Sequence, residues 1–225
     1  TGVFGIHPYS PAAAELMHHD TSCDWVSRAV SSRVMSAAAI ELVDRDTELA
    51  RLRACLDGAL GGRGGLMVIE GEAGIGKSAL VAAGVAQAAA EGMRTLGARG
   101  SELERGFPWG VVRQALERSV RGRHELLTGR AALAASILGE SAQGAPGVGE
   151  GLLHGLYWVL AGLAETEPLL LTVDDAHWGD EESVAFLRFL ALRLAGLRTA
   201  VVVATRPPRS EDSLAALLAD PAVVA

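Results

Sequence analysis

Short apolar runs alternate along the chain with longer stretches of helical periodicity. The runs occupy residues 66–69, 169–173 and 200–204, and a weaker one occupies 95–99. Continuous apolar runs of this length, bounded by residues such as proline and aspartate, are typical of strands that are covered on both faces. We therefore predict four strands, separated by helical segments.

Helical periodicity is clearest where leucines recur at every fourth position. Leu52, Leu56 and Leu60 form such a stripe and predict an amphipathic helix that Thr47 or Asp46 caps. The stretch after residue 78 is apolar nearly all round, which indicates a helix buried against a sheet. In chain order, the later helices are predicted over 79–91 (ended by Gly92), 108–121, 131–138, 152–164 and 181–194, with a glycine-rich surface loop over 139–151.

The alternation of strands with helices determines the fold class. It predicts an α/β fold with a mainly parallel open sheet. Residues 1–38 lack this alternation and are interrupted by Pro8 and Pro11, so we predict a poorly ordered N-terminal leader there. The folded domain is expected over residues 39–225.

The composition indicates a globular domain with a large core. Hydrophobic residues make up 49% of the chain, but aromatic residues only 4%, so the core must consist of alanine, leucine and valine. The formal net charge of −7 argues against nucleic-acid binding by this chain alone. The densest basic group is interleaved with apolar residues, as on a solvated helix face: Arg118, Arg121, Arg123 and Arg130.

The cysteines and the apolar segments bear on location. Cys23 and Cys55 lack C-x-x-C spacing and predict no disulfide framework, which suits a reducing cytosol. No signal peptide is visible, and the longest apolar run, over 156–164, is too short to span a bilayer. We therefore expect a cytoplasmic protein.

The clearest motif is Gly71-Glu72-Ala73-Gly74-Ile75-Gly76-Lys77-Ser78, which fits the phosphate-binding pattern G-x-x-x-x-G-K-[ST] at every fixed position. It lies between a predicted strand and a predicted helix, as such a loop requires. Its glycines let backbone N–H groups surround a polyphosphate, and the start of the helix favours negative charge. Lys77 is expected to reach the β- and γ-phosphates, and the Ser78 hydroxyl to hold Mg²⁺.

A pair of aspartates stands where the most apolar strand ends. A phosphate loop needs a carboxylate at the tip of a neighbouring strand to hold Mg²⁺ through its water shell, and Asp174 has that position. Asp175 is expected to orient or deprotonate the attacking water. For His177 two interpretations stay open, contact with the γ-phosphate or packing in the turn. Asp180 is expected to cap the next helix.

Thr205 and Arg206 follow the last predicted strand, which places a hydroxyl and a guanidinium at the same edge of the sheet. The Arg206 guanidinium is suited to contact a phosphate. The alternative is that Arg206 anchors the loop at Pro207-Pro208.

The segments at 42–49, 71–78, 169–180 and 201–207 stand in an order that resembles a known family. The most specific string is Asp174-Asp175-Ala176-His177-Trp178-Gly179-Asp180. From about residue 40 onward, the chain resembles the ATPase module of large LuxR-family transcriptional regulators, in the STAND branch of AAA-like P-loop NTPases. The resemblance implies a three-layer αβα P-loop fold and binding of ATP with Mg²⁺.

The resemblance also implies roles for single residues. Residues 71–78 would hold the nucleotide, with Lys77 and Ser78 on phosphate and Mg²⁺. Asp174 would complete the Mg²⁺ site, and Asp175 would be the catalytic carboxylate.

Two further parts of the site are implied at the ends of the resembling segment. Thr205 and Arg206 would form a catalytic sensor at the tip of the strand that lies between the other two. Arg45 would lie near the nucleotide at the domain entrance, although Asp44 stands where the family often has glycine.

The family usually continues into another sheet strand, a winged-helix segment, helical repeats that sense an inducer, and a DNA-binding helix-turn-helix. We therefore expect a domain that is incomplete at its C-terminus, with residues 221–225 beginning the next strand. The strand that leads into the phosphate loop would then be an unprotected edge. In a full-length parent, an inducer or signal protein and DNA would be partners, self-association would depend on nucleotide, and no membrane would be involved.

Two functional hypotheses follow. The first is a regulatory switch that binds ATP and Mg²⁺ and is reset by slow hydrolysis. The alternative is a stand-alone P-loop enzyme, either a DNA-remodelling AAA ATPase or a small-molecule kinase. Brisk phosphoryl transfer to a small acceptor, or stimulation by DNA, would favour the alternative.

Overall fold

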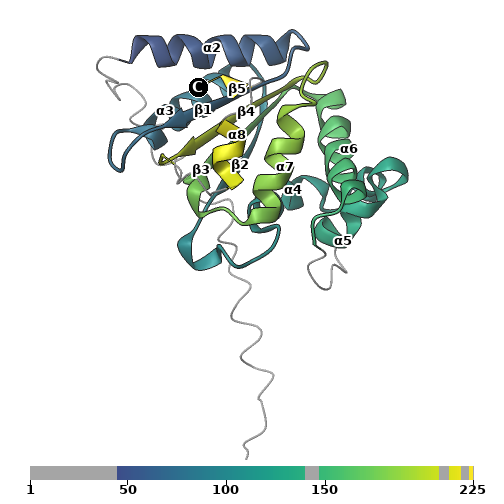
Figure 1. Cartoon of the computed structure of the whole chain (residues 1–225). Coiled ribbons are helices and arrows are strands. Elements are labelled where there is room, and N and C mark those ends of the chain that lie inside the picture. The colour runs from purple at the N-terminus through teal and green to yellow at the C-terminus, as the bar shows by residue number, and fades with distance from the viewer. Residues whose placement is uncertain (1–44, 140–146, 208–212, 219–222, 225) are drawn as a thin grey trace, which may run out of the picture.

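The computed structural model describes residues 45–139, 147–207, 213–218 and 223–224 (Figure 1). The predicted leader over 1–38 lies outside these residues, and so does part of the predicted loop over 139–151. Within the described ranges, no helix combines the length and the apolar character needed to cross a membrane.

One sheet of five strands forms the middle layer. Its strands are β1 (Gly65–Glu70), β2 (Arg94–Arg99), β3 (Leu169–Asp174), β4 (Thr199–Thr205) and β5 (Val223–Val224). Their order is β2-β3-β4-β1-β5, and each neighbouring pair is parallel. The four predicted strands are confirmed, as is the α/β fold with a parallel open sheet.

The expectation of an unprotected edge at β1 is wrong for part of that strand. Val223 and Val224 pair with Leu66 and Met67 on the side of β1 that faces away from β4. The first half of β1 therefore has a hydrogen-bonded neighbour on each side.

Helices cover both faces of the sheet (Figure 1). On one face lie α2 (Asp46–Leu60) and α3 (Lys77–Ala90), and on the other lie α4 (Gly110–Val120), α6 (Glu150–Thr166) and α7 (Glu181–Ala191). Shorter elements connect them: η3 (Glu102–Glu104), η4 (His124–Leu127), η5 (Gly129–Ala134), α5 (Ala135–Leu138), η6 (Ala176–Trp178) and α8 (Ser213–Leu218).

Two cores result, one on each face of the sheet. Along β4, Val201 and Val203 pack into the core beneath α4, α6 and α7, whereas Val202 and Ala204 pack with α2 and α3. Every residue of β3 and β4 is buried, which is why their sequences are continuous apolar runs rather than alternating ones. The three-layer arrangement predicted from the family resemblance is confirmed.

The predicted helices are present, with differences at their ends. α2 begins directly after Arg45, so Asp46 and Thr47 lie within its first turn and the predicted side-chain cap by either of them is wrong. The helix predicted over 131–138 is divided between η5 and α5, and α7 ends at Ala191 rather than at 194. Gly92 follows the end of α3 with a φ of 73°, a left-handed conformation that suits glycine.

Asp180 joins two helices of the second face. Its Oδ1 accepts the N–H of Ser183 at 2.8 Å, which caps α7 as predicted, and the N–H of Trp109 at 2.8 Å. Its Oδ2 accepts the N–H of Val111 at 3.2 Å. Asp180 is buried, so a single carboxylate satisfies backbone donors at the starts of both α4 and α7. This contact also fixes the turn that follows β3.

The Asp180→Ala substitution should lower the free energy of unfolding by roughly 2–4 kcal/mol, because three buried backbone N–H groups lose their acceptor. Urea unfolding monitored by circular dichroism measures the change. The matched control is Glu181→Ala, at the next residue, whose exposed side chain should cost less than about 1 kcal/mol. Equal losses in the two variants would contradict the double cap.

Candidate functional site

The loop between β1 and α3 has backbone geometry that its glycines permit. Gly74 and Gly76 have φ values of 80° and 93°, a left-handed conformation that is unfavourable for other residues. A Cβ atom on Gly71 would lie 2.9 Å from Cγ2 of Ile75, so the loop closes tightly on itself there. The first N–H groups of a helix have no acceptor within the helix, so the start of α3 is suited to bind an anion.

Lys77 lies inside this loop. Its Nζ donates to the carbonyl oxygens of Gly71 at 2.7 Å and Glu72 at 2.8 Å, and the residue is 7% exposed. The ammonium is thus held at the centre of the loop, where it can also meet phosphate oxygens. Lys77 is the only lysine in the sequence.

Ser78 contacts the aspartate predicted to share a metal ion with it. Its hydroxyl donates to Oδ2 of Asp174 at 2.7 Å, and Oδ1 of Asp174 accepts the N–H of Asp175 at 2.9 Å. Asp174 is 1% exposed at the end of β3. Mg²⁺ that is bound together with a phosphate requires oxygen ligands next to the phosphate loop. The Ser78 hydroxyl and the buried Asp174 carboxylate supply such oxygens.

Asp175 is engaged by Arg99, a residue that the sequence analysis did not single out. Nε and Nη2 of Arg99 both donate to Oδ2 of Asp175, at 3.0 Å and 2.6 Å. The hydrogen bond to Asp175 is the main cause that raises the pKa of the Arg99 guanidinium above its ordinary value, against the opposing effect of burial. Arg99 ends β2 and pairs in register with Asp174, so sheet order brings it to the site.

Gly100 allows the end of β2 to approach the turn after β3. Its N–H donates to the carbonyl oxygen of Asp174 at 2.8 Å. A Cβ atom at this position would lie 2.3 Å from the carbonyl oxygen of Asp175, which is a severe clash. The Arg99 side chain is positioned by this close backbone contact.

Thr205 and Arg206 lie at the tip of β4, which is between β3 and β1 as predicted. Thr205 is fully buried, and its hydroxyl donates to the carbonyl oxygen of Arg206 at 2.9 Å. The carbonyl oxygen of Thr205 accepts the N–H of Gly71 at 3.2 Å, which connects β4 to the phosphate loop. The Arg206 side chain is exposed.

Arg45 contacts the phosphate loop. Its guanidinium donates to the carbonyl oxygen of Ile75. A Cβ atom on Gly76 would lie 3.7 Å from the same guanidinium, so Arg45 crosses the loop at its second half. Asp44, which departs from the family pattern, lies outside the described residues.

His177 lies in the turn after β3, among the charged groups of the site. Both of its ring nitrogens are buried and lack a hydrogen-bond partner. Burial lowers the pKa of His177; the charges of Arg206 and Lys77 act in the same direction, and that of Asp175 opposes them. A neutral ring among these groups is compatible with both interpretations, packing and phosphate contact.

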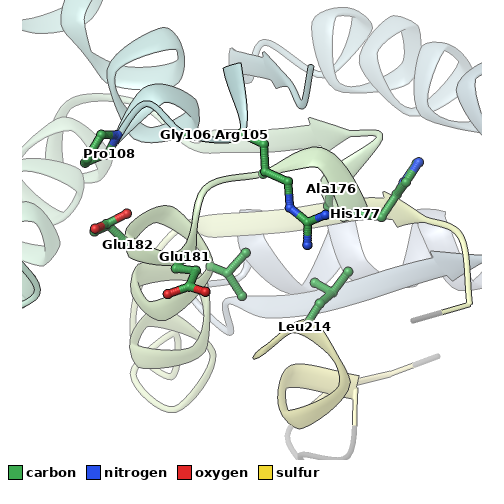
Figure 2. A pocket seen from close by; sticks show the side chains of 10 residues that line it. Arg105, Gly106, Pro108, Ala176, His177, Glu181, Glu182 and Leu214 are labelled. Carbon is green, nitrogen blue, oxygen red and sulfur yellow. The ribbon is translucent and has the colours of Figure 1, made fainter. Parts of the chain in front are cut away.

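The same turn contributes Ala176, His177 and Gly179 to the wall of a pocket of about 290 Å³ (Figure 2). Its walls include Arg105 from the β2–α4 connection, Glu181 and Glu182 from α7, and Leu214 from α8. No residue of the phosphate loop lines it, and His177 belongs to its wall. In Figure 2 the His177 ring is directed away from Arg105.

The lowered pKa of His177 predicts a pH-dependent stability. The unfolded chain binds a proton at His177 near the ordinary pKa of about 6.5, whereas the folded protein binds it only at lower pH. The neutral ring therefore makes its full contribution to the free energy of unfolding above about pH 6.5, and this contribution is lost as the pH falls. The His177→Gln variant should therefore lose less unfolding free energy than the wild type between about pH 7.5 and about pH 5. The exposed His124→Gln serves as the control. An NMR titration that places the His177 pKa at or above about 6.5 would contradict this prediction.

A family model described as "AAA ATPase domain" matches residues 41–203. Among solved structures, the Orc1 protein of Aeropyrum pernix, in complex with DNA, is 17% identical with a TM-score of 0.44. That match covers 89% of this chain and 48% of the Orc1 chain, so this chain spans about half of that protein's length. No curated protein matches the chain.

The family match spans most of the chain and includes the phosphate loop, β3 and nearly all of β4. It agrees with the parallel sheet, with the glycine loop between β1 and α3, and with the carboxylate at the tip of β3. The chain therefore belongs to the AAA ATPase domain family and has the fold of a P-loop NTPase.

Proposed function

We propose that this domain binds ATP together with Mg²⁺ and acts as the nucleotide-dependent switch of a signal-responsive LuxR-family transcriptional regulator, reset by slow hydrolysis. The observation that carries the nucleotide site is the contact of Ser78 with Asp174 next to the buried Lys77. The regulatory part rests on the resemblance of residues 174–180 to that family.

In this proposal the loop backbone over 71–78 and the Lys77 ammonium hold the phosphates, and Arg45 lies at the edge of the nucleotide. Ser78 and Asp174 would hold Mg²⁺, with Asp174 acting through water as the family resemblance implies. The metal supplies charge neutralisation at the β- and γ-phosphates. Two observations support the fit of these residues to ATP and Mg²⁺. The loop has left-handed backbone at Gly74 and Gly76, as a tight phosphate loop requires, and the Lys77 amine lies within the loop.

The catalytic roles in the proposal belong to three side chains. Asp175 orients the attacking water or accepts its proton. Thr205 and Arg206 form a sensor at the tip of β4, where the Arg206 guanidinium is exposed and able to contact a phosphate. The buried Thr205 hydroxyl fixes the backbone on which Arg206 stands.

The partners in the proposal follow from the regulatory role. An inducer or signal protein and DNA would act through other segments of a full-length regulator, and self-association would depend on nucleotide. The ATPase unit is proposed to occupy residues 39–225, and the protein to work in the cytoplasm.

The Lys77→Ala substitution should weaken ATP binding by roughly ten- to a hundredfold, because charge-assisted hydrogen bonds to phosphate are lost. Equilibrium binding of a fluorescent ATP analogue with Mg²⁺ measures this change. The Asp174→Asn variant should bind ATP with a reduced dependence on Mg²⁺. The control is Asp57→Asn, at an exposed position of α2, which should bind as the wild type does. Unchanged affinity in Lys77→Ala would refute the site.

Steady-state turnover separates the switch from a stand-alone enzyme. The switch predicts slow hydrolysis that double-stranded DNA does not stimulate. Strong stimulation by DNA, or rapid phosphoryl transfer to a small acceptor, would favour the alternative.

A further inference from the structure

We propose that the pocket formed by the turn after β3, the start of α7 and the β2–α4 connection binds a small zwitterion, of the chemical class of the free amino acids. The Arg105 guanidinium holds the carboxylate of this ligand, and Glu181 with Glu182 holds its ammonium group. The inference goes beyond the nucleotide site and does not depend on ATP binding.

Opposite charges line this pocket without satisfying one another. It has a volume of about 290 Å³, and its lining includes Arg105, Glu181 and Glu182. Within the part of the chain that the structure describes, none of these three side chains has a hydrogen bond or an ion pair. Figure 2 shows the Arg105 guanidinium and the Glu181 carboxylate on different sides of the pocket. Both are therefore free to pair with a ligand that carries the two complementary charges.

The backbone that carries the charged walls is fixed by a buried contact. Arg105 follows η3 in the β2–α4 connection, and the two glutamates begin α7. The Asp180 carboxylate accepts the N–H groups of Trp109, at the start of α4, and of Ser183, in α7. The fold therefore brings together side chains that are distant in the sequence.

The rest of the lining favours a ligand with an aliphatic part. Pro108, Val184 and Leu214 supply apolar surface, and Val184 and Leu214 are buried. The volume is at the lower end of the range for ligand pockets, so it suits a ligand of about ten non-hydrogen atoms. An amino acid with a side chain of several carbons has this size.

The balance of charge favours a basic amino acid. The lining has two carboxylates and one guanidinium, and burial lowers the pKa of His177, so its ring is neutral near pH 7. Negative charge is thus in excess, and a ligand with a net positive charge is complementary to it. We expect L-arginine to bind more tightly than L-leucine, and L-leucine more tightly than L-glutamate.

The pocket is adjacent to the nucleotide site and separate from it. His177 lies in its wall, and the charges of Lys77 and Arg206 act on the same ring. No residue of the phosphate loop belongs to the lining. Binding at the pocket and binding at the phosphate loop can therefore be changed by different substitutions.

An NMR titration of nucleotide-free protein with L-arginine measures the binding. The amide signals of residues 105–106 and 176–182 should shift and saturate, with a dissociation constant of roughly 0.1–1 mM, whereas those of residues 71–78 should not shift. The expected affinity is modest because ion pairs at exposed side chains are screened by water and salt.

Substitutions on each wall test the assignment of the charges. Arg105→Gln and Glu181→Gln should each weaken L-arginine binding roughly five- to tenfold, because one charge of the ligand loses its partner. Both side chains are exposed, so the variants should fold as the wild type does. The matched controls are Arg53→Gln and Glu165→Gln, which remove exposed charges outside the pocket and should bind as the wild type does.

Ligand analogues test the same pairing from the other side. Agmatine lacks the carboxylate of L-arginine and Nα-acetyl-L-arginine lacks its α-ammonium group, so each should bind roughly five- to tenfold more weakly. Arg105→Gln should not weaken the binding of agmatine, which has no carboxylate to lose.

Three results would overturn the inference. The first is the absence of saturable shifts at residues 105–106 and 176–182 with any of the three amino acids up to about 10 mM. The second is wild-type affinity for L-arginine in both Arg105→Gln and Glu181→Gln. The third is tighter binding of L-glutamate than of L-arginine.

Discussion

The hydrogen bond from the Ser78 hydroxyl to the Asp174 carboxylate is the contact on which the rest of the site depends. It joins the start of α3 to the tip of β3 across a long sequence separation. The bond forms because β1 and β3 are parallel and lie on either side of β4, so their carboxyl ends meet at one edge of the sheet. The loop that carries Lys77 is then fixed against a buried carboxylate, which is the arrangement that a phosphate-bound metal needs.

The same edge of the sheet brings further polar groups to the site. β4 contributes Thr205 and is hydrogen-bonded to the loop through Gly71, and β2 contributes Arg99. The apolar runs that form the strands therefore have two consequences. They bury both faces of the sheet, and they end together, so that the polar residues that follow each run are brought into contact.

Sequence reasoning predicted the parts of this arrangement that are local. The phosphate loop, Asp174 and the cap by Asp180 follow from residue types next to an apolar run or a helix start, and the structure places them as expected. The contacts that depend on where β2 lies in the sheet were missed. The local sequence around Arg99 does not indicate that β2 lies beside β3. The ion pair of Arg99 with Asp175 was therefore not predicted. The second role of Asp180, at the start of α4, also depends on a contact between distant segments.

The single lysine gives the most direct test of an ATP site at the loop. An acyl-phosphate derivative of ATP transfers its acyl group to a lysine amine that lies next to the bound phosphates, and Lys77 is the only lysine side chain that can react. Peptide mass spectrometry should find the acyl group on Lys77, and an excess of ATP with Mg²⁺ should prevent the reaction. Labelling of Lys77 that excess ATP does not reduce, or no labelling of Lys77, would contradict the assignment of this loop as the nucleotide site.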